Sequence, residues 1–154
     1  MSLAKTFYLL KDAETRAGEL YALISLNVSI AHPELSDLFS DLAREEELHA
    51  RQIVLMQNLF LQSEESFLDK VEMESSIAEF MQNLEMTKNY LNQHHAEIQP
   101  RDLINLALDL ERNLVEKHRM LFLKAADPQI KSLLQSLNLA DASHIKKLHA
   151  FPLG

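Results

Sequence analysis

Two short motifs in this 154-residue chain place a carboxylate and an imidazole three residues apart. Glu46 and His49 form a Glu-x-x-His pair, and Asp141 and His144 nearly repeat it toward the C-terminus. Residues three apart on a helix project from one face on adjacent turns. Carboxylate and imidazole groups together suit iron or manganese, and zinc is also compatible. The two motifs therefore indicate a metal site, provided that other side chains complete it.

Each motif is matched by a single glutamate on an earlier predicted helix. Glu14 precedes Glu46 by 32 residues and Glu111 precedes Asp141 by 30, so the two halves look like a distant repeat. Four carboxylates and two neutral imidazoles balance two divalent ions, whereas the same groups alone would leave like charges uncompensated in a core. The predicted ligands are Glu14, Glu46, His49, Glu111, Asp141 and His144.

Each of these pieces alone has a simpler explanation. A lone Glu-x-x-His pair is usually part of a solvated helix face, and the acidic run at 45–47 is typical of a surface. A single buried histidine is more often a hydrogen-bonded core residue than a ligand. The metal interpretation is favoured because four predicted helices are each interrupted near the middle by a residue of the expected type.

Two further polar residues occupy equivalent places in the two halves. Tyr21 follows Glu14 by seven residues, and His118 follows Glu111 by seven. Either side chain could hydrogen-bond a ligand, or pack in the core with its polar tip satisfied. The remaining histidines lie away from the predicted site and are expected at the surface: His32, His94, His95 and His149.

The helices that position these residues can be read from apolar side chains at alternating steps of three and four. Four such stripes cover residues 3–28, 35–60, 104–125 and 130–151, and the predicted ligands fall within them. A separate helical stretch with an apolar side lies between the second and third stripes, at 73–91.

Prolines mark where these helices begin. Pro33 ends the first helix and starts the second, Gln99-Pro100 opens the third, and Asp127-Pro128 supplies an N-cap followed by proline. The links at Pro33 and Asp127 are short, which forces antiparallel hairpins, whereas the second link is long and helical. We therefore predict an all-α, ferritin-like four-helix bundle of two antiparallel hairpins with a long helical crossover between helices 2 and 3.

Composition limits the remaining classes of protein. The length favours a single ferritin-like domain over residues 1–154, and the net charge of −8 argues against a nucleic-acid partner. The absence of cysteine excludes disulfides, thiolate nucleophiles and cysteine-ligated metal sites within these residues. No apolar run approaches a membrane span and no signal layout is visible, so a cytoplasmic protein without a membrane partner is expected.

The sequence resembles the rubrerythrin branch of the ferritin-like superfamily over nearly its whole length. The most specific pieces are residues 14–21, with a glutamate seven residues before a tyrosine, and residues 42–50, an alanine-flanked acidic run ending in Glu-x-x-His. The resemblance implies a di-iron site. Its implied iron ligands are Glu14, Glu46, His49, Glu111 and His144, with Asp141 at the position of the last glutamate.

The chain departs from the rubrerythrin pattern in three ways. It has no counterpart of the four-cysteine rubredoxin-like domain. Leu114 stands where the family has a second glutamate, which exchanges with a histidine as the irons change redox state. Asp141 is one methylene shorter than glutamate and loses about 1.5 Å of reach. It could ligate one ion without bridging, leave an open site, or weaken the second site.

The leading functional prediction is a di-iron oxidoreductase that reacts with peroxide or dioxygen, as a peroxide reductase or ferroxidase-like enzyme. Electrons would come from an external donor or from Fe(II) itself. One alternative is a non-catalytic ferritin-like module that binds metal for storage, sensing or stability, and another is a metal-free bundle that serves as a dimer or adaptor. The crossover helix covers either its own bundle or a second copy in a homodimer with its apolar side chains, Met73, Ile77, Phe80 and Leu84.

Overall fold

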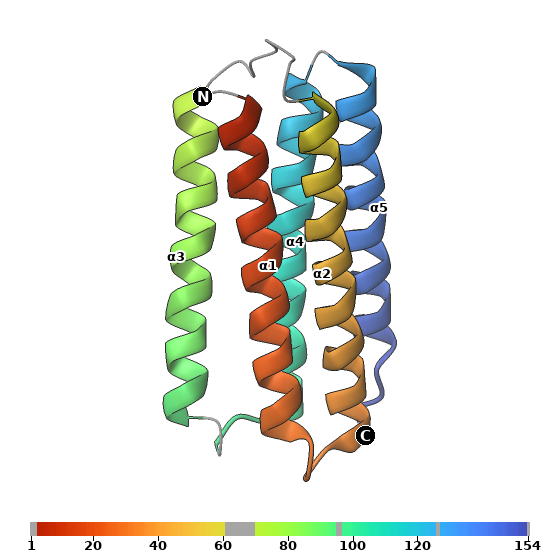
Figure 1. Ribbon diagram of the computed structural model, residues 1–154. Coiled ribbons are helices and arrows are strands. Elements are labelled where there is room, and N and C mark those ends of the chain that lie inside the picture. The colour runs from red at the N-terminus through yellow and green to blue at the C-terminus, as the bar shows by residue number, and fades with distance from the viewer. Residues whose placement is uncertain (1–2, 61–69, 95–96, 126, 154) are drawn as a thin grey trace.

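Five helices make up the described part of the computed structural model, which covers residues 3–60, 70–94, 97–125 and 127–153. They are α1 (Leu3–Val28), α2 (Pro33–Phe60), α3 (Lys70–His94), α4 (Pro100–Lys124) and α5 (Pro128–Ala150). One antiparallel hairpin is formed by α1 and α2 and the other by α4 and α5, with α3 beside α1 on the outside (Figure 1). The all-α bundle predicted from the sequence is confirmed.

The crossover helix α3 determines the direction of the second hairpin. It runs along the bundle and returns the chain to the end where α2 begins, so α2 and α4 point the same way (Figure 1). It packs against α1 and, less extensively, against α4. Among its described side chains, the buried ones are Ile77, Phe80, Leu84 and Leu91. The crossover therefore covers its own bundle with these residues, whereas the side chain of Met73 lies outside the described part.

Local sequence fixes the helix ends and the first hairpin. Pro33, Pro100 and Pro128 each begin a helix at its first position, where the missing N–H costs no intrahelical bond. The Asp127 carboxylate caps α5 by accepting hydrogen bonds from the backbone N–H groups of Gln129 and Ile130, at 2.8 and 3.3 Å. Across the first hairpin, the hydroxyls of Ser25 and Ser36 each donate to the other residue's backbone carbonyl at 2.8 Å.

The interior consists of two apolar clusters with a polar layer between them. One cluster includes Leu10 of α1 and Ile53 of α2, and the other includes Ala17 of α1 and Leu42 of α2. Along α2 and α5 the buried carboxylates and imidazoles fall between the two clusters, and Glu14 of α1 converges with them. The layer consists of Glu14, Glu46, His49, Glu111, His118, Asp141 and His144. Apolar packing on both sides holds the backbone of this layer at fixed positions.

The helices α1 and α2 approach closely at Gly18. A Cβ atom on this residue would lie 3.3 Å from the backbone oxygen of Ala43 and 3.3 Å from the Cβ of Glu46. Distances this short leave no room for a side chain without a shift of the helix backbone. Glycine therefore permits the contact that places Glu46 against α1.

The outer surface carries mostly short-range ion pairs. Examples are Arg16 with Asp12 on α1 and Arg119 with Glu116 on α4, at 3.4 and 3.2 Å. Exposed pairs of this kind contribute little to stability. Within the described residues, none of the helices has an apolar stretch long enough to cross a membrane.

Candidate metal centre

Six polar side chains from four helices converge at the middle of the bundle. They form two overlapping sets, and within each set one ligand atom per residue lies within 4.8 Å of the others. The first set is Glu14, Glu46, His49 and Asp141, and the second is Glu46, Glu111, Asp141 and His144. The two sets share Glu46 and Asp141. Two sets of ligand-type side chains that share members are consistent with a binuclear metal site.

The two histidines repeat the same geometry in the two halves. The Nδ1 of His49 lies 3.4 Å from Oε2 of Glu46 and 3.8 Å from Oε2 of Glu14. The Nδ1 of His144 lies 3.1 Å from Oε1 of Glu46 and 3.3 Å from Oε1 of Glu111. The two imidazole rings stack with centroids 5.4 Å apart. Each ring therefore faces Glu46 and the lone glutamate of its own half.

The polar atoms of the centre fit a pair of divalent cations. Within the described part of the chain, five buried carboxylate oxygens have no hydrogen-bond partner: both of Glu14, Oε1 of Glu46, Oε2 of Glu111 and Oδ1 of Asp141. Although His118 Nε2 lies 2.9 Å from Glu14 Oε1, the two atoms lack hydrogen-bond geometry. Buried carboxylate oxygens without a partner are costly, and a bound cation removes that cost. Oxygen and nitrogen donors of this kind suit iron or manganese.

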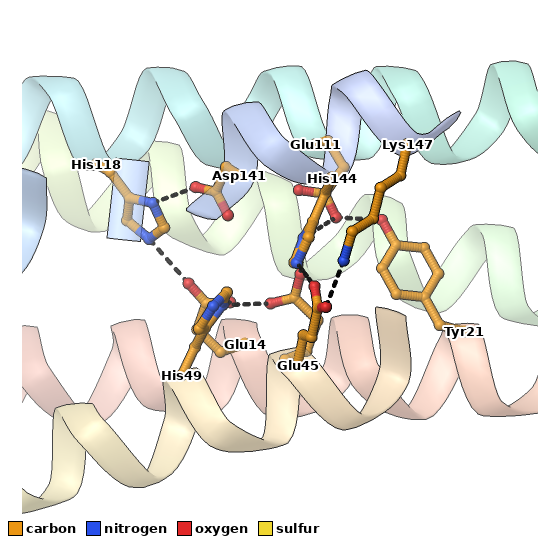
Figure 2. Close-up of polar contacts among 10 residues, drawn as sticks. Glu14, Tyr21, Glu45, His49, Glu111, His118, Asp141, His144 and Lys147 are labelled. Carbon is orange, nitrogen blue, oxygen red and sulfur yellow. Dashed lines mark hydrogen bonds and ion pairs between the residues drawn. The ribbon is translucent and has the colours of Figure 1, made fainter. Parts of the chain in front are cut away.

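Tyr21 and His118 both contact predicted ligands from the opposite half. The Tyr21 hydroxyl donates to Oε1 of Glu111 at 2.7 Å. His118 lies between Glu14 and Asp141, with its Nδ1 2.5 Å from Oδ2 of Asp141 (Figure 2). Both side chains are therefore buried in the core, and their polar groups contact residues that are predicted to be ligands.

The two glutamates of the first set differ in their affinity for protons. Burial and the charges of Glu14, Glu111 and Asp141 raise the pKa of Glu46 well above its usual value. Burial also acts to raise the pKa of Glu14, but interactions with Glu46, His118 and His49 outweigh it and lower the pKa. Glu46 therefore binds a proton more readily than Glu14 does, and a cation bound at the centre would compete with that proton.

His118 balances the negative charge on the other side of the centre. Burial disfavours its charged form, but the hydrogen bond with Asp141 and the nearby carboxylate of Glu14 outweigh burial and raise the pKa of His118 to about 10. Burial raises the pKa of Asp141 to about 6, although His118 favours the ionised carboxylate. Burial and the nearby carboxylates also raise the pKa of Tyr21, so its hydroxyl remains a donor.

Glu45 is a contact of the centre that the sequence did not reveal. Its side chain is only 33% exposed, touches Nε2 of His144 and accepts a hydrogen bond from Nζ of Lys147 at 2.5 Å (Figure 2). The surface assignment of the acidic run is correct for Glu47, which is exposed and pairs with Arg51 at 2.6 Å. Burial alone would raise the pKa of Glu45, but the Lys147 hydrogen bond and the charges of His144 and Lys147 lower it.

The other histidines lie away from the centre. His32 and His149 are exposed, as predicted. His94 is half-buried at the end of α3, with its Nδ1 3.5 Å from a carboxylate oxygen of Glu97. His95 lies outside the described residues.

Comparison with known families agrees with this centre. The family model of rubrerythrin matches residues 11–151, a range that includes every residue of the polar layer. Comparisons with curated proteins and with solved structures give no match.

Proposed function

The chain belongs to the rubrerythrin family, and we propose that it binds two iron ions and reduces hydrogen peroxide. The observation that carries the proposal is the pair of overlapping ligand sets that share Glu46 and Asp141. In this assignment one ion is held on the side of Glu14 and His49, and the other on the side of Glu111 and His144. Manganese or zinc could occupy the same donors.

The chemistry divides between the ions and the side chains. When bound, a pair of Fe(II) ions supplies the two electrons that, with two protons, convert one peroxide molecule into two water molecules. His49 and His144 each fix one ion from a different hairpin. Tyr21 and His118 hold the carboxylates in place from the outside, as partners of metal ligands commonly do.

Burial of the centre favours a small oxidant as the substrate. His49 is 7% exposed, whereas the other five predicted ligands are each at most 1% exposed. We therefore expect a small oxidant such as peroxide or dioxygen to enter on the side of His49, the most exposed of the six. A larger organic substrate would have to separate the helices. The same burial keeps bulk water away from the centre.

The electrons must enter from outside these residues. The 154 residues contain no cysteine, so they cannot supply a cysteine-ligated iron centre as an internal donor. An external reductant would support repeated peroxide reduction. Alternatively, Fe(II) would itself be the oxidised substrate, with dioxygen or peroxide as the acceptor.

Metal analysis and peroxide consumption test this proposal. After iron loading, we expect about two irons per chain, and the anaerobically reduced protein should consume about one peroxide for every two Fe(II) ions. A Glu46→Ala change should lower the iron content, because Glu46 belongs to both sets. Glu47→Ala, at an exposed neighbour, is the matched control. Iron content unchanged by Glu46→Ala, or no peroxide consumption by the reduced protein, would overturn the proposal.

One observation favours a non-catalytic metal-binding role as a second candidate. Leu114 lies one turn after Glu111 and is buried in an apolar cluster, so it offers no oxygen to the centre. The additional carboxylate expected at this place from the family resemblance is therefore missing. In this case the protein would bind its ions but show no repeated turnover with excess reductant and peroxide, which a multiple-turnover assay measures.

A further inference from the structure

The two ring nitrogens of His144 face different surroundings. Its Nδ1 points into the centre, 3.1 Å from a Glu46 oxygen and 3.3 Å from a Glu111 oxygen. Its Nε2 points outward and contacts Oε2 of Glu45. Figure 2 shows the Glu45 carboxylate joined by contacts to both His144 and Lys147. The ring is therefore held from outside by a residue that belongs to neither ligand set.

Glu45 is itself anchored in this position. Its second carboxylate oxygen, Oε1, lies 2.5 Å from Nζ of Lys147, which follows His144 by three residues on α5. One side chain of α2 thus contacts two consecutive turns of α5, a helix of the other hairpin. Because both carboxylate oxygens are engaged, the carboxylate has little freedom to turn away from the imidazole.

We propose that Glu45 is a positioning residue that accepts the Nε2–H of His144 and thereby leaves the Nδ1 lone pair for the metal ion between Glu46 and Glu111. A neutral imidazole has one N–H and one lone pair, so a fixed acceptor at Nε2 determines which nitrogen can bind metal. This inference rests on the proposed two-metal function.

Among the described residues, only the half of the centre that contains His144 has a supporting carboxylate like Glu45. The repeat relation pairs Glu46 with Asp141, so the residue equivalent to Glu45 is the one before Asp141, which is Ala140. An alanine side chain cannot accept a hydrogen bond, and His49 therefore lacks the same support from its opposite half. The two metal positions should differ, with the position at His144 depending on Glu45 and the position at His49 not depending on it.

Stepwise metal titration of Glu45→Ala against a competing chelator tests this difference, because alanine, unlike glutamine, offers no acceptor to Nε2. We expect one of the two binding steps to weaken by about 10–100-fold while the other stays unchanged. Glu47→Ala, which removes an exposed carboxylate two residues away, should leave both steps unchanged. Lys147→Met should weaken the same single step by at most about fivefold, because it breaks only a partly exposed ion pair. Equal weakening of both steps, or of neither, would overturn the inference.

A measurement on the unaltered protein keeps the inference testable if Glu45→Ala does not fold. Zinc is diamagnetic, so long-range proton–nitrogen correlation spectra of the zinc-loaded, ¹⁵N-labelled protein report the state of each imidazole nitrogen. We expect His144 with a protonated Nε2 and a metal-bound Nδ1, and a metal-bound Nε2 would contradict the role of Glu45. A protein that binds no metal would overturn the proposed function as well, whereas two bound ions with both binding steps unaffected by Glu45→Ala would overturn the role of Glu45 alone.

Discussion

At the scale of single residues, the short side chain of Asp141 is in direct contact with the imidazole of His118. Asp141 is fully buried and contributes to both ligand sets, although it has less reach than a glutamate. His118 Nδ1 lies 2.5 Å from Oδ2 of Asp141, and its Nε2 lies 2.9 Å from Oε1 of Glu14. In the equivalent place of the other half, Tyr21 contacts Glu111. Tyr21 and His118 thus each contact the lone glutamate of the opposite half, one through a hydroxyl and the other through an imidazole.

We expect His118→Leu to destabilise the metal-free protein strongly. The change removes the cationic partner of Glu14 and Asp141 and leaves both carboxylates buried. Removing one partner of a buried ion pair costs about 3–5 kcal/mol. Urea unfolding in the presence of chelator measures this cost, with His149→Leu at an exposed position of α5 as the control. Bound metal should restore part of the loss, because it compensates the same carboxylates. Equal stability of the two variants would contradict the role of His118.

Tyr21→Phe should have a smaller effect in the same direction. The change removes the hydrogen bond to Oε1 of Glu111 without changing the ring that packs beside Phe39. A hydrogen bond to a charged group contributes about 1.5–3 kcal/mol to stability. The exposed Tyr90 provides the control Tyr90→Phe, which should leave the free energy of unfolding unchanged. A Tyr21→Phe variant as stable as Tyr90→Phe would show that the contact is not a stabilising one.

At the scale of helices, the close contact at Gly18 links the packing of the first hairpin to the metal centre. Gly18 of α1 faces the backbone of α2 at Ala43 and the Cβ of Glu46. A larger residue there must push α2 outward, and Glu46 moves with it. Because Glu46 belongs to both ligand sets, a shift of this helix changes both metal positions together.

Gly18→Val should therefore lower both stability and metal affinity. Overpacking of a close contact costs about 1–3 kcal/mol. Ala22→Val, one turn later on the same helix at an exposed position, introduces the same side chain without this contact. Thermal unfolding and chelator competition compare the two variants. The contact would lose its proposed importance if both variants bound metal as tightly as the unaltered protein.

The helices and the six converging residues could be predicted from the sequence because both depend on local spacing. Prolines at positions 33, 100 and 128 begin helices whatever their partners are, and Glu14 or Glu111 stands out because it interrupts an apolar stripe. The position of Glu45 could not be predicted in this way. It is adjacent to Glu46 and so points about 100° away around the helix, and only the packing of α2 against α5 decides what it meets there. The contact of His118 with both Glu14 and Asp141 is likewise a tertiary property.

At the scale of the whole molecule, the polar layer is the part of the interior where the two hairpins contact each other through polar rather than apolar side chains. The predicted ligands come from both hairpins, and the apolar clusters lie on either side of them. Repulsion among the carboxylates weakens this layer when no cation is present. Each bound ion would have ligands from both hairpins, so metal binding and association of the hairpins should be coupled.

Metal should consequently raise the melting temperature of the whole bundle. An ion that binds only the folded protein, at a free concentration 100 times its Kd, stabilises it by about 2.7 kcal/mol. For a domain of this size that corresponds to an increase in Tm of about 5–11 °C. Calorimetry with and without chelator measures the difference, and Glu46→Ala should reduce it because the variant lacks the carboxylate shared by both sets. If chelator left the Tm of the metal-loaded, unaltered protein unchanged, the hairpins would be held together by apolar packing alone. The protein would then be the metal-free bundle that serves as a dimer or adaptor.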